Sequence, residues 1–88
     1  MHHERRTETR VEVKLPLRLA SGETGITRDI SSRGLFFELD DECSLADEIN
    51  LSVGLSLHGQ TVWQEKQYKV IRVVRDQGRM GVAVQLLN

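Results

Sequence analysis

Arginine side chains near the N-terminus are the first residues of the sequence whose types and spacing could do chemistry. Arg6 and Arg10 lie four residues apart, and Arg5 directly precedes Arg6. A guanidinium carries five donors in a planar fork, so it can bind a phosphate through two hydrogen bonds and can also stack on a purine ring. Two or three such groups on a short arm could wrap a ligand that carries both phosphates and guanines. Taken alone, the spacing favours a simpler interpretation, a solvated tail whose charges are balanced by Glu4 and Glu8.

The second such feature is the segment 29–34, which reads Asp-Ile-Ser-Ser-Arg-Gly. A carboxylate at Asp29 can accept two hydrogen bonds from N1 and N2 of a guanine, and the Ser31 hydroxyl adds a short-range donor or acceptor. Gly34 allows a positive φ angle, or lets a ligand approach where a side chain would collide. We expect Arg33 to point to solvent. Alone, the segment also fits an ordinary Asx or Ser turn between two strands.

The elements that must position these residues are predicted to be β-strands. Apolar and polar residues alternate with a period of two, which is the spacing of strands with one buried face. The expected strands cover residues 11–19, 26–30, 35–39, 51–57, 61–64, 68–75 and 80–87. The expected turns cover residues 21–25, 32–34 and 58–60, with a four-residue hairpin loop over 76–79. Pro16 has no amide hydrogen, so the first strand lies at an edge or carries a bulge there.

Six or seven short strands without a convincing helix indicate an all-β sandwich or a small barrel. The acidic connection 40–48 could hold one helical turn, although it is too poor in apolar residues for an amphipathic helix. Closing the sheet into a barrel would also remove exposed strand edges.

Alternation along the second expected strand bears directly on segment 29–34. It places Thr27, Asp29 and Ser31 on one face of the strand, with Ile26 and Ile30 on the other. We therefore expect the strand to aim Asp29 and Ser31 in the same direction.

Length and composition limit what the chain can be. Its 88 residues support one core and therefore one domain, and 39% hydrophobic with 28% charged residues is typical of a folded globular protein. Cys43 is the only cysteine, so an internal disulfide and a multi-cysteine metal site are both impossible. No apolar run is long enough for a membrane helix or a signal peptide, so we expect a cytoplasmic protein that does not bind membranes.

The charge distribution argues against a protein that grips nucleic acid through general electrostatics. The net charge is −1, whereas such domains carry an excess of lysine and arginine. Residues 1–34 hold seven basic and five acidic side chains, residues 38–50 hold six acidic and no basic ones, and residues 51–88 hold five basic and two acidic ones. An anionic ligand would therefore find partners near the N-terminus or on the last strands.

Taken together and in this order, the two features resemble the PilZ domain family. That family is identified by an Arg-x-x-x-Arg arm, matched here by Arg6 and Arg10, followed by an Asp/Asn-x-Ser-x-x-Gly turn. Asp29, Ser31 and Gly34 match the turn.

The resemblance extends to the end of the chain, where residues 70–84 look like the closing hairpin of the family. It implies a six-stranded antiparallel β-barrel formed by residues 11–88, preceded by a flexible arginine-bearing arm formed by residues 1–10.

The resemblance also implies a ligand, the bacterial second messenger cyclic dimeric GMP. In this family the arm arginines, here Arg6 and Arg10, engage phosphates and stack on guanines, while Asp29 and Ser31 would read guanine edges. An extra arginine before the motif, here Arg5, accompanies binding of a stacked ligand dimer, which favours two ligand molecules per domain.

The function expected from the resemblance is that of a receptor and adaptor in second-messenger signalling. Ligand binding would order the arm and change the surface that a downstream protein partner meets, without a cofactor. No Ser/His/Asp or Cys/His arrangement and no phosphate-binding glycine pattern is present, so we do not expect an enzyme. Two alternatives stay open: a ligand-independent PilZ interaction module, or a small barrel that binds single-stranded nucleic acid through a positive groove with exposed aromatics.

The remaining candidates are weaker. His2, His3 and His58 have no accompanying carboxylate or thiol cluster, so no metal site is expected. Trp63 and Tyr68 could stack on bases, but in a chain with so few aromatics we expect them to serve core or rim packing.

Overall fold

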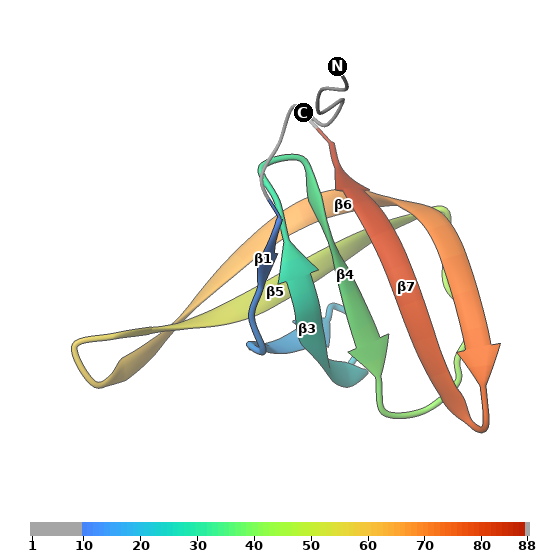
Figure 1. Cartoon of the computed structure of the whole chain (residues 1–88), viewed down its shortest axis with the longest axis horizontal. Helices are drawn as coiled ribbons and strands as arrows, with labels where there is room; N and C mark the ends of the chain where they lie inside the picture. Colours follow the sequence, from blue (N-terminus) through green and yellow to red (C-terminus); the bar gives the residue numbers. More distant parts are fainter. Residues whose placement is uncertain (1–9, 88) are drawn as a thin grey trace, which may run out of the picture.

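The computed structural model describes residues 10–87, which form a single antiparallel sheet closed into a barrel (Figure 1). The strands are β1 (Val11–Glu12), β2 (Pro16–Leu19), β3 (Thr24–Ile30), β4 (Gly34–Leu39), β5 (Glu48–Leu57), β6 (Gln60–Asp76) and β7 (Arg79–Leu86). Their order is β1-β3-β2-β5-β6-β7-β4, and a further pairing of β3 with β4 closes a ring of six strands. β1 pairs with β3 outside this ring. The all-β fold and the six-stranded antiparallel barrel expected from the sequence are confirmed.

The interior of the barrel is filled by alternate residues of its strands. β4 shows the pattern most clearly, because Leu35, Phe37 and Leu39 are buried while Phe36 and Glu38 face outward. The buried apolar residues are Leu17, Leu19, Leu35, Phe37, Leu39, Leu51, Tyr68, Met80, Val82 and Val84. These residues form one contiguous core, as expected for a chain of this length.

The strand expected over 11–19 is interrupted between β1 and β2. Thr27 of β3 occupies the interruption, where its fully buried hydroxyl donates to the carbonyl of Val13 at 2.6 Å and accepts from the amide of Leu15 at 2.8 Å. Pro16 then begins β2 without an amide hydrogen to donate. The irregularity expected near Pro16 therefore exists, and the Thr27 hydroxyl supplements the two backbone hydrogen bonds that still join residues 13–15 to β3.

Because of a bulge in β3, its residues do not lie on the faces of the strand that the sequence predicted. The register of β3 against β4 shifts between Thr27 and Asp29, so one extra residue lies on β3 and the alternation reverses. Thr27 is buried inside the barrel, whereas Asp29 faces outward. Likewise, Ile26 is 46% exposed while Ile30 packs against the core. The predictions that Thr27 shares a face with Asp29, and Ile26 with Ile30, are therefore wrong.

A single long strand, β6, replaces the two strands expected over 61–64 and 68–75. Its first half pairs only with β5, and its second half, from Tyr68 onward, pairs with β7. The outer parts of β5 and β6 therefore leave the barrel as a two-stranded extension, which we call the projecting ribbon (residues 54–64; Figure 1).

Two connections are tighter than expected. Gln77 and Gly78 have φ angles of 53° and 82°, as a two-residue type I′ turn requires, in place of the expected four-residue loop. His58 and Gly59 form the same kind of turn at the tip of the projecting ribbon. Residues 40–47 contain no helical turn, and Cys43 there donates its amide to the Met80 sulfur at 3.0 Å.

Candidate functional site

The turn between β3 and β4 holds the Asp-x-Ser-x-x-Gly residues. Its backbone is closed by the Ser31 amide, which donates to the Gly34 carbonyl at 2.9 Å, and the Ser31 hydroxyl donates to the same oxygen at 3.2 Å. The carbonyl of Arg33 accepts a hydrogen bond of 2.6 Å from Leu86, which ties the turn to β7. The expected turn over 32–34 is thus found at residues 31–33, between the end of β3 and the start of β4, and it is fastened at one end of the barrel.

Gly34 is required for a reason that sequence alone does not reveal. Its φ angle is not positive, but a Cβ added there would lie 2.1 Å from the carbonyl oxygen of Val84. Glycine therefore allows the backbones of β4 and β7 to approach where the ring closes. The structural need at this position comes from a neighbouring strand rather than from a positive φ angle.

Arg10 and Asp29 form an ion pair beside this turn. Arg10 Nη1 lies 3.6 Å from Asp29 Oδ1, and the two side chains are 40% and 28% exposed. That separation is too long for a hydrogen bond, and among residues 10–87 the buried Oδ1 has no hydrogen-bond donor. A buried carboxylate oxygen without a donor is unusual in folded proteins, so Asp29 is a candidate acceptor for a ligand that displaces the groups covering this oxygen.

A hollow on the outer surface brings Arg10, Ser31 and Arg33 together. It is lined by Arg10, Ser31, Arg33, Gly34, Leu35, Ile71, Ala83, Val84 and Gln85. Arg33 is exposed, as expected, but it lines the same hollow as Arg10, so two arginines border this space. Two cations above an apolar floor suit an anion that also carries a flat ring.

Ile71 and Ala83, which line this outer hollow, were missed by the sequence reasoning. The register of β6 against β7 shifts between Val70 and Arg72, so Ile71 is the extra residue of a bulge and is 54% exposed. Alternation of apolar residues cannot reveal such a shift. The sequence hints at it only through the adjacent apolar residues Val70 and Ile71, which break the alternation.

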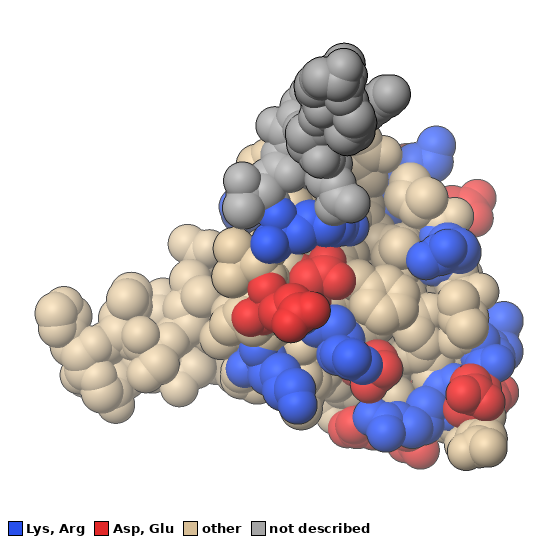
Figure 2. Space-filling view, in the orientation of Figure 1, with Lys and Arg blue, Asp and Glu red and all other residues tan. Residues whose placement is uncertain are grey.

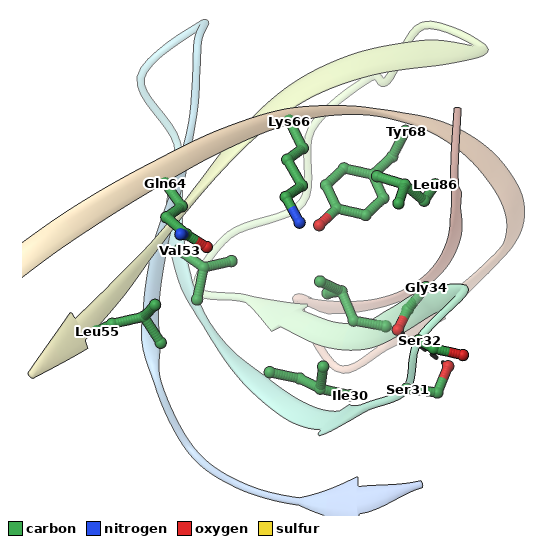
Figure 3. A pocket seen from close by; sticks show the side chains of 11 residues that line it. Ile30, Ser31, Ser32, Gly34, Val53, Leu55, Gln64, Lys66, Tyr68 and Leu86 are labelled. Atoms are coloured by element: carbon green, nitrogen blue, oxygen red, sulfur yellow. Dashed lines mark hydrogen bonds between the residues drawn. The ribbon is translucent and has the colours of Figure 1, made fainter. Parts of the chain in front are cut away.

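A second hollow opens at the end of the barrel, on the other side of the turn (Figure 3). It has a volume of about 160 Å³ and is lined by Ile30, Ser31, Ser32, Gly34, Leu35, Val53, Leu55, Gln64, Lys66, Tyr68 and Leu86. Figure 3 shows Lys66 and the Tyr68 ring pointing into this hollow across from Ser31. Burial raises the pKa of the Tyr68 phenol, so its hydroxyl stays protonated at neutral pH.

The candidate residues are therefore close together without sharing one hollow. Asp29 lines a third hollow, with Glu12, Val13, Lys14, Arg28 and Phe36, whereas Ser31 lines the other two. Asp29 and Ser31 do not line one hollow, contrary to expectation, because β3 ends at Ile30 and the chain turns at Ser31. Arg10 connects the two, since it pairs with Asp29 and lies beside Ser31. Arg5 and Arg6 lie outside the described residues.

Other chemistry-bearing residues are explained by packing. Tyr68 is 7% exposed within the core, and Trp63 carries the Arg18 guanidinium 4.1 Å above its ring centroid, so the expected core and rim roles are confirmed. Burial raises the pKa of the Cys43 thiol, which disfavours the nucleophilic thiolate.

Neither a metal cluster nor a membrane helix occurs in the described part of the chain. Within residues 10–87, no three His, Cys, Asp or Glu side chains gather closely enough to hold a metal ion. His58 lies in this part, and His2 and His3 lie outside it. No helix there is long and apolar enough to cross a lipid bilayer.

Comparison with known proteins agrees with this geometry. Residues 4–88 match the family description "PilZ domain", a range that includes every candidate ligand-binding residue. No curated protein matches the chain.

Two solved structures show the same fold. The Bacillus subtilis inhibitor of motility MotI/DgrA superposes with a TM-score of 0.80 at 19% identity, over 98% of this chain and 44% of its own. The PilZ domain of CeSA from a cellulose-synthesizing bacterium superposes with a TM-score of 0.56 at 21% identity, over 91% of this chain and 82% of its own. The chain thus spans less than half the length of MotI/DgrA.

Proposed function

Because the chain belongs to the PilZ domain family, whose members are generally receptors for cyclic dimeric GMP, we propose that it is a cytoplasmic receptor for this ligand. Domains of this family are binding and adaptor modules rather than enzymes. Binding would fix Arg5 and Arg6 over the ligand and would change the surface that a downstream protein meets. The conclusion rests chiefly on the ion pair of Arg10 with Asp29 beside Ser31.

In this proposal, the arginines that line the outer hollow bind the phosphates of the ligand. Arg10 and Arg33 both line this hollow, and Arg10 is 40% exposed, so its charge is open to a ligand. A guanidinium binds a phosphate through two parallel hydrogen bonds, and each charge-assisted bond is stronger than a neutral one. The exposed side chain of Ile71 and the neighbouring Ala83 offer an apolar surface for the face of a purine.

The guanine edge is matched by Asp29. Its Oδ1 accepts no hydrogen bond from residues 10–87, and its ion pair with Arg10 is long enough to be rearranged at little cost. A guanine presenting N1–H and N2–H would supply the donors that this carboxylate lacks. Ser31 keeps a lone pair for the ligand, since its hydroxyl hydrogen is used by the carbonyl of Gly34.

Calorimetric titration with cyclic dimeric GMP tests the proposal. Arg10→Ala and Asp29→Asn should each weaken binding about ten- to a hundredfold, because each removes a charge-assisted contact worth about 1.5–3 kcal/mol. Arg79→Ala is the matched control, since Arg79 is an exposed arginine paired with Glu38 and outside the three hollows that hold Arg10, Asp29 and Ser31. Its affinity should equal that of the unchanged chain.

Two outcomes would count against the receptor. If the unchanged chain binds no cyclic dimeric GMP, it is a ligand-independent interaction module of the same fold. If Arg10→Ala and Asp29→Asn both bind with unchanged affinity, the site is elsewhere. The stoichiometry of the same titration tests the role of Arg5, with two ligands per domain expected, and a parallel titration with a single-stranded oligonucleotide should show no binding.

A further inference from the structure

The projecting ribbon (residues 54–64) pairs with no third strand in the described part of the chain, and it touches the barrel where Arg18 stacks on Trp63 and Pro16 lies beside Gly54. Pairing of β5 with β2 stops at Val53, beside Pro16, and pairing of β6 with β7 starts only at Tyr68. The ribbon therefore consists of two strands paired only with each other, and an isolated two-stranded hairpin is marginally stable in water. A ribbon of this kind needs a further surface against which to pack.

The ribbon is also free of charge. No Asp, Glu, Lys or Arg occurs between Val53 and Gln64, whereas acidic and basic side chains are interspersed over the barrel (Figure 2). Leu57, Val62 and Trp63 are 51%, 41% and 38% exposed, so a large share of the exposed apolar surface lies here. Uncharged apolar surface of this extent is typical of a contact with another protein surface.

The open edge of β6 is the feature that protein sheets normally protect. Charged side chains, prolines and shortness are the usual protections. β1 is protected by its length of two residues, and the edge of β5 is protected at Gly54 by the ring of Pro16. The edge of β6 from Gln60 to Lys66 has no such protection along its outer part.

The geometry of this edge makes it complementary to itself. Leu57 and Gln60 flank a two-residue turn and are paired, so alternation directs the backbone amides and carbonyls of Thr61, Trp63 and Glu65 outward. Thr61 and Glu65 lie two residues before and two residues after Trp63, so the three outward-facing positions are evenly spaced about Trp63. A second β6 edge turned by a two-fold axis at Trp63 would place Thr61 opposite Glu65 and Trp63 opposite its own copy, forming about six hydrogen bonds.

We propose that the projecting ribbon pairs with the same ribbon of a second copy of this chain, edge to edge along β6. Identical copies bring identical charges together at a two-fold axis, so an uncharged ribbon suits this partner better than the charged barrel does. In the register centred on Trp63, Glu65 faces Thr61 and Lys66 faces Gln60, so no like charges are opposed. The β6 edge borders the second hollow through Gln64 and Lys66, but the pairing is argued from the edge alone and does not rest on the proposed receptor function.

Sedimentation of the full chain over a range of concentrations tests the pairing. The unchanged chain should form a dimer, and Trp63→Lys and Trp63→Glu should each raise the dimer dissociation constant about tenfold or more, since each opposes like charges at the axis. An equimolar mixture of the two variants should restore the dimer, because lysine then faces glutamate. Val74→Lys, which changes an exposed apolar residue where β6 pairs with β7, should leave the dimer unchanged.

A second pair of variants guards against a loss of folding. Thr61→Pro removes an amide from the open edge without removing a bond between β5 and β6, whereas Thr61→Val keeps that amide. With circular dichroism unchanged in both, the first should be monomeric and the second dimeric. A chain that stays monomeric up to about 1 mM, a dimer that both charge variants leave intact, or a mixture that does not associate would each overturn the proposal.

Discussion

Replacing Gly34 with alanine should destabilise the barrel through β7 rather than through the ligand site. The added Cβ would lie 2.1 Å from the Val84 carbonyl oxygen, about 1 Å inside an ordinary contact, so β4 and β7 would have to separate. Overpacking of this size costs about 1–3 kcal/mol, and weakening an adjacent ladder hydrogen bond adds about 1 kcal/mol. We expect a loss of about 2–4 kcal/mol in the free energy of unfolding.

Urea unfolding monitored by circular dichroism measures this loss. With a slope of about 1 kcal/mol per molar, typical of small domains in urea, the midpoint should fall by about 2–4 M. Domains of this size have total stabilities of about 4–13 kcal/mol, so the variant should remain largely folded without urea if the domain lies in the upper part of this range. Its affinity for cyclic dimeric GMP, measured on the folded protein, should fall less than that of Arg10→Ala, because the added methyl group removes no charged contact.

Gly25 provides a matched control outside the ligand motif. A Cβ there would lie 2.1 Å from the Glu38 carbonyl oxygen, the same obstruction at a different strand pair, so Gly25→Ala should be equally destabilised. Gly78 has open space and a φ angle of 82°, so Gly78→Ala should cost only about 1–2 kcal/mol of backbone strain. If Gly34→Ala has an unchanged midpoint but loses the ligand, the glycine serves binding and the reasoning from β7 is refuted.

Two further predictions concern buried hydroxyl groups. Thr27→Val should destabilise the chain by about 2–4 kcal/mol in urea unfolding, because the Val13 carbonyl and the Leu15 amide lose their partner, while Thr27→Ser should recover much of the loss. Burial raises the pKa of Tyr68 above its ordinary value of 10.0, so the folded state holds this proton more tightly than the unfolded state. Stability should therefore fall above about pH 10, by up to about 1.4 kcal/mol per pH unit from this group, and Tyr68→Phe should remove that part of the alkaline decline.

Most strands could be predicted from alternation because most of them have one face in the barrel. The strand expected over 35–39 illustrates this, since Leu35, Phe37 and Leu39 all point inward. β6 could not be predicted as one strand, because residues 60–67 are exposed on both faces and have no alternation to read. The tight turn at Gln77 and Gly78 was hidden for a different reason, because Asp76 and Arg79 look like loop residues although they pair with each other.

The candidate site could be predicted in its members but not in its arrangement. The order of the motifs led to Arg10, Asp29 and Ser31 through family resemblance, and the structure places these residues near one another. Their orientation depends on the bulge after Thr27, which adds one residue and reverses the alternation that the prediction used. Ile71 lines the outer hollow because of a second bulge, in β6, and the alternation of apolar residues could not predict that bulge either.

Because β1 lies outside the closed ring, it should open locally at a lower free-energy cost than the barrel itself. Its two residues pair only with β3, whereas the six other strands each have neighbours on both sides along at least part of their length. Releasing β1 would break few hydrogen bonds and expose little of the core, so local opening there is far cheaper than global unfolding. Arg10 directly precedes this strand, so the surface around Arg10 can change while the barrel stays folded.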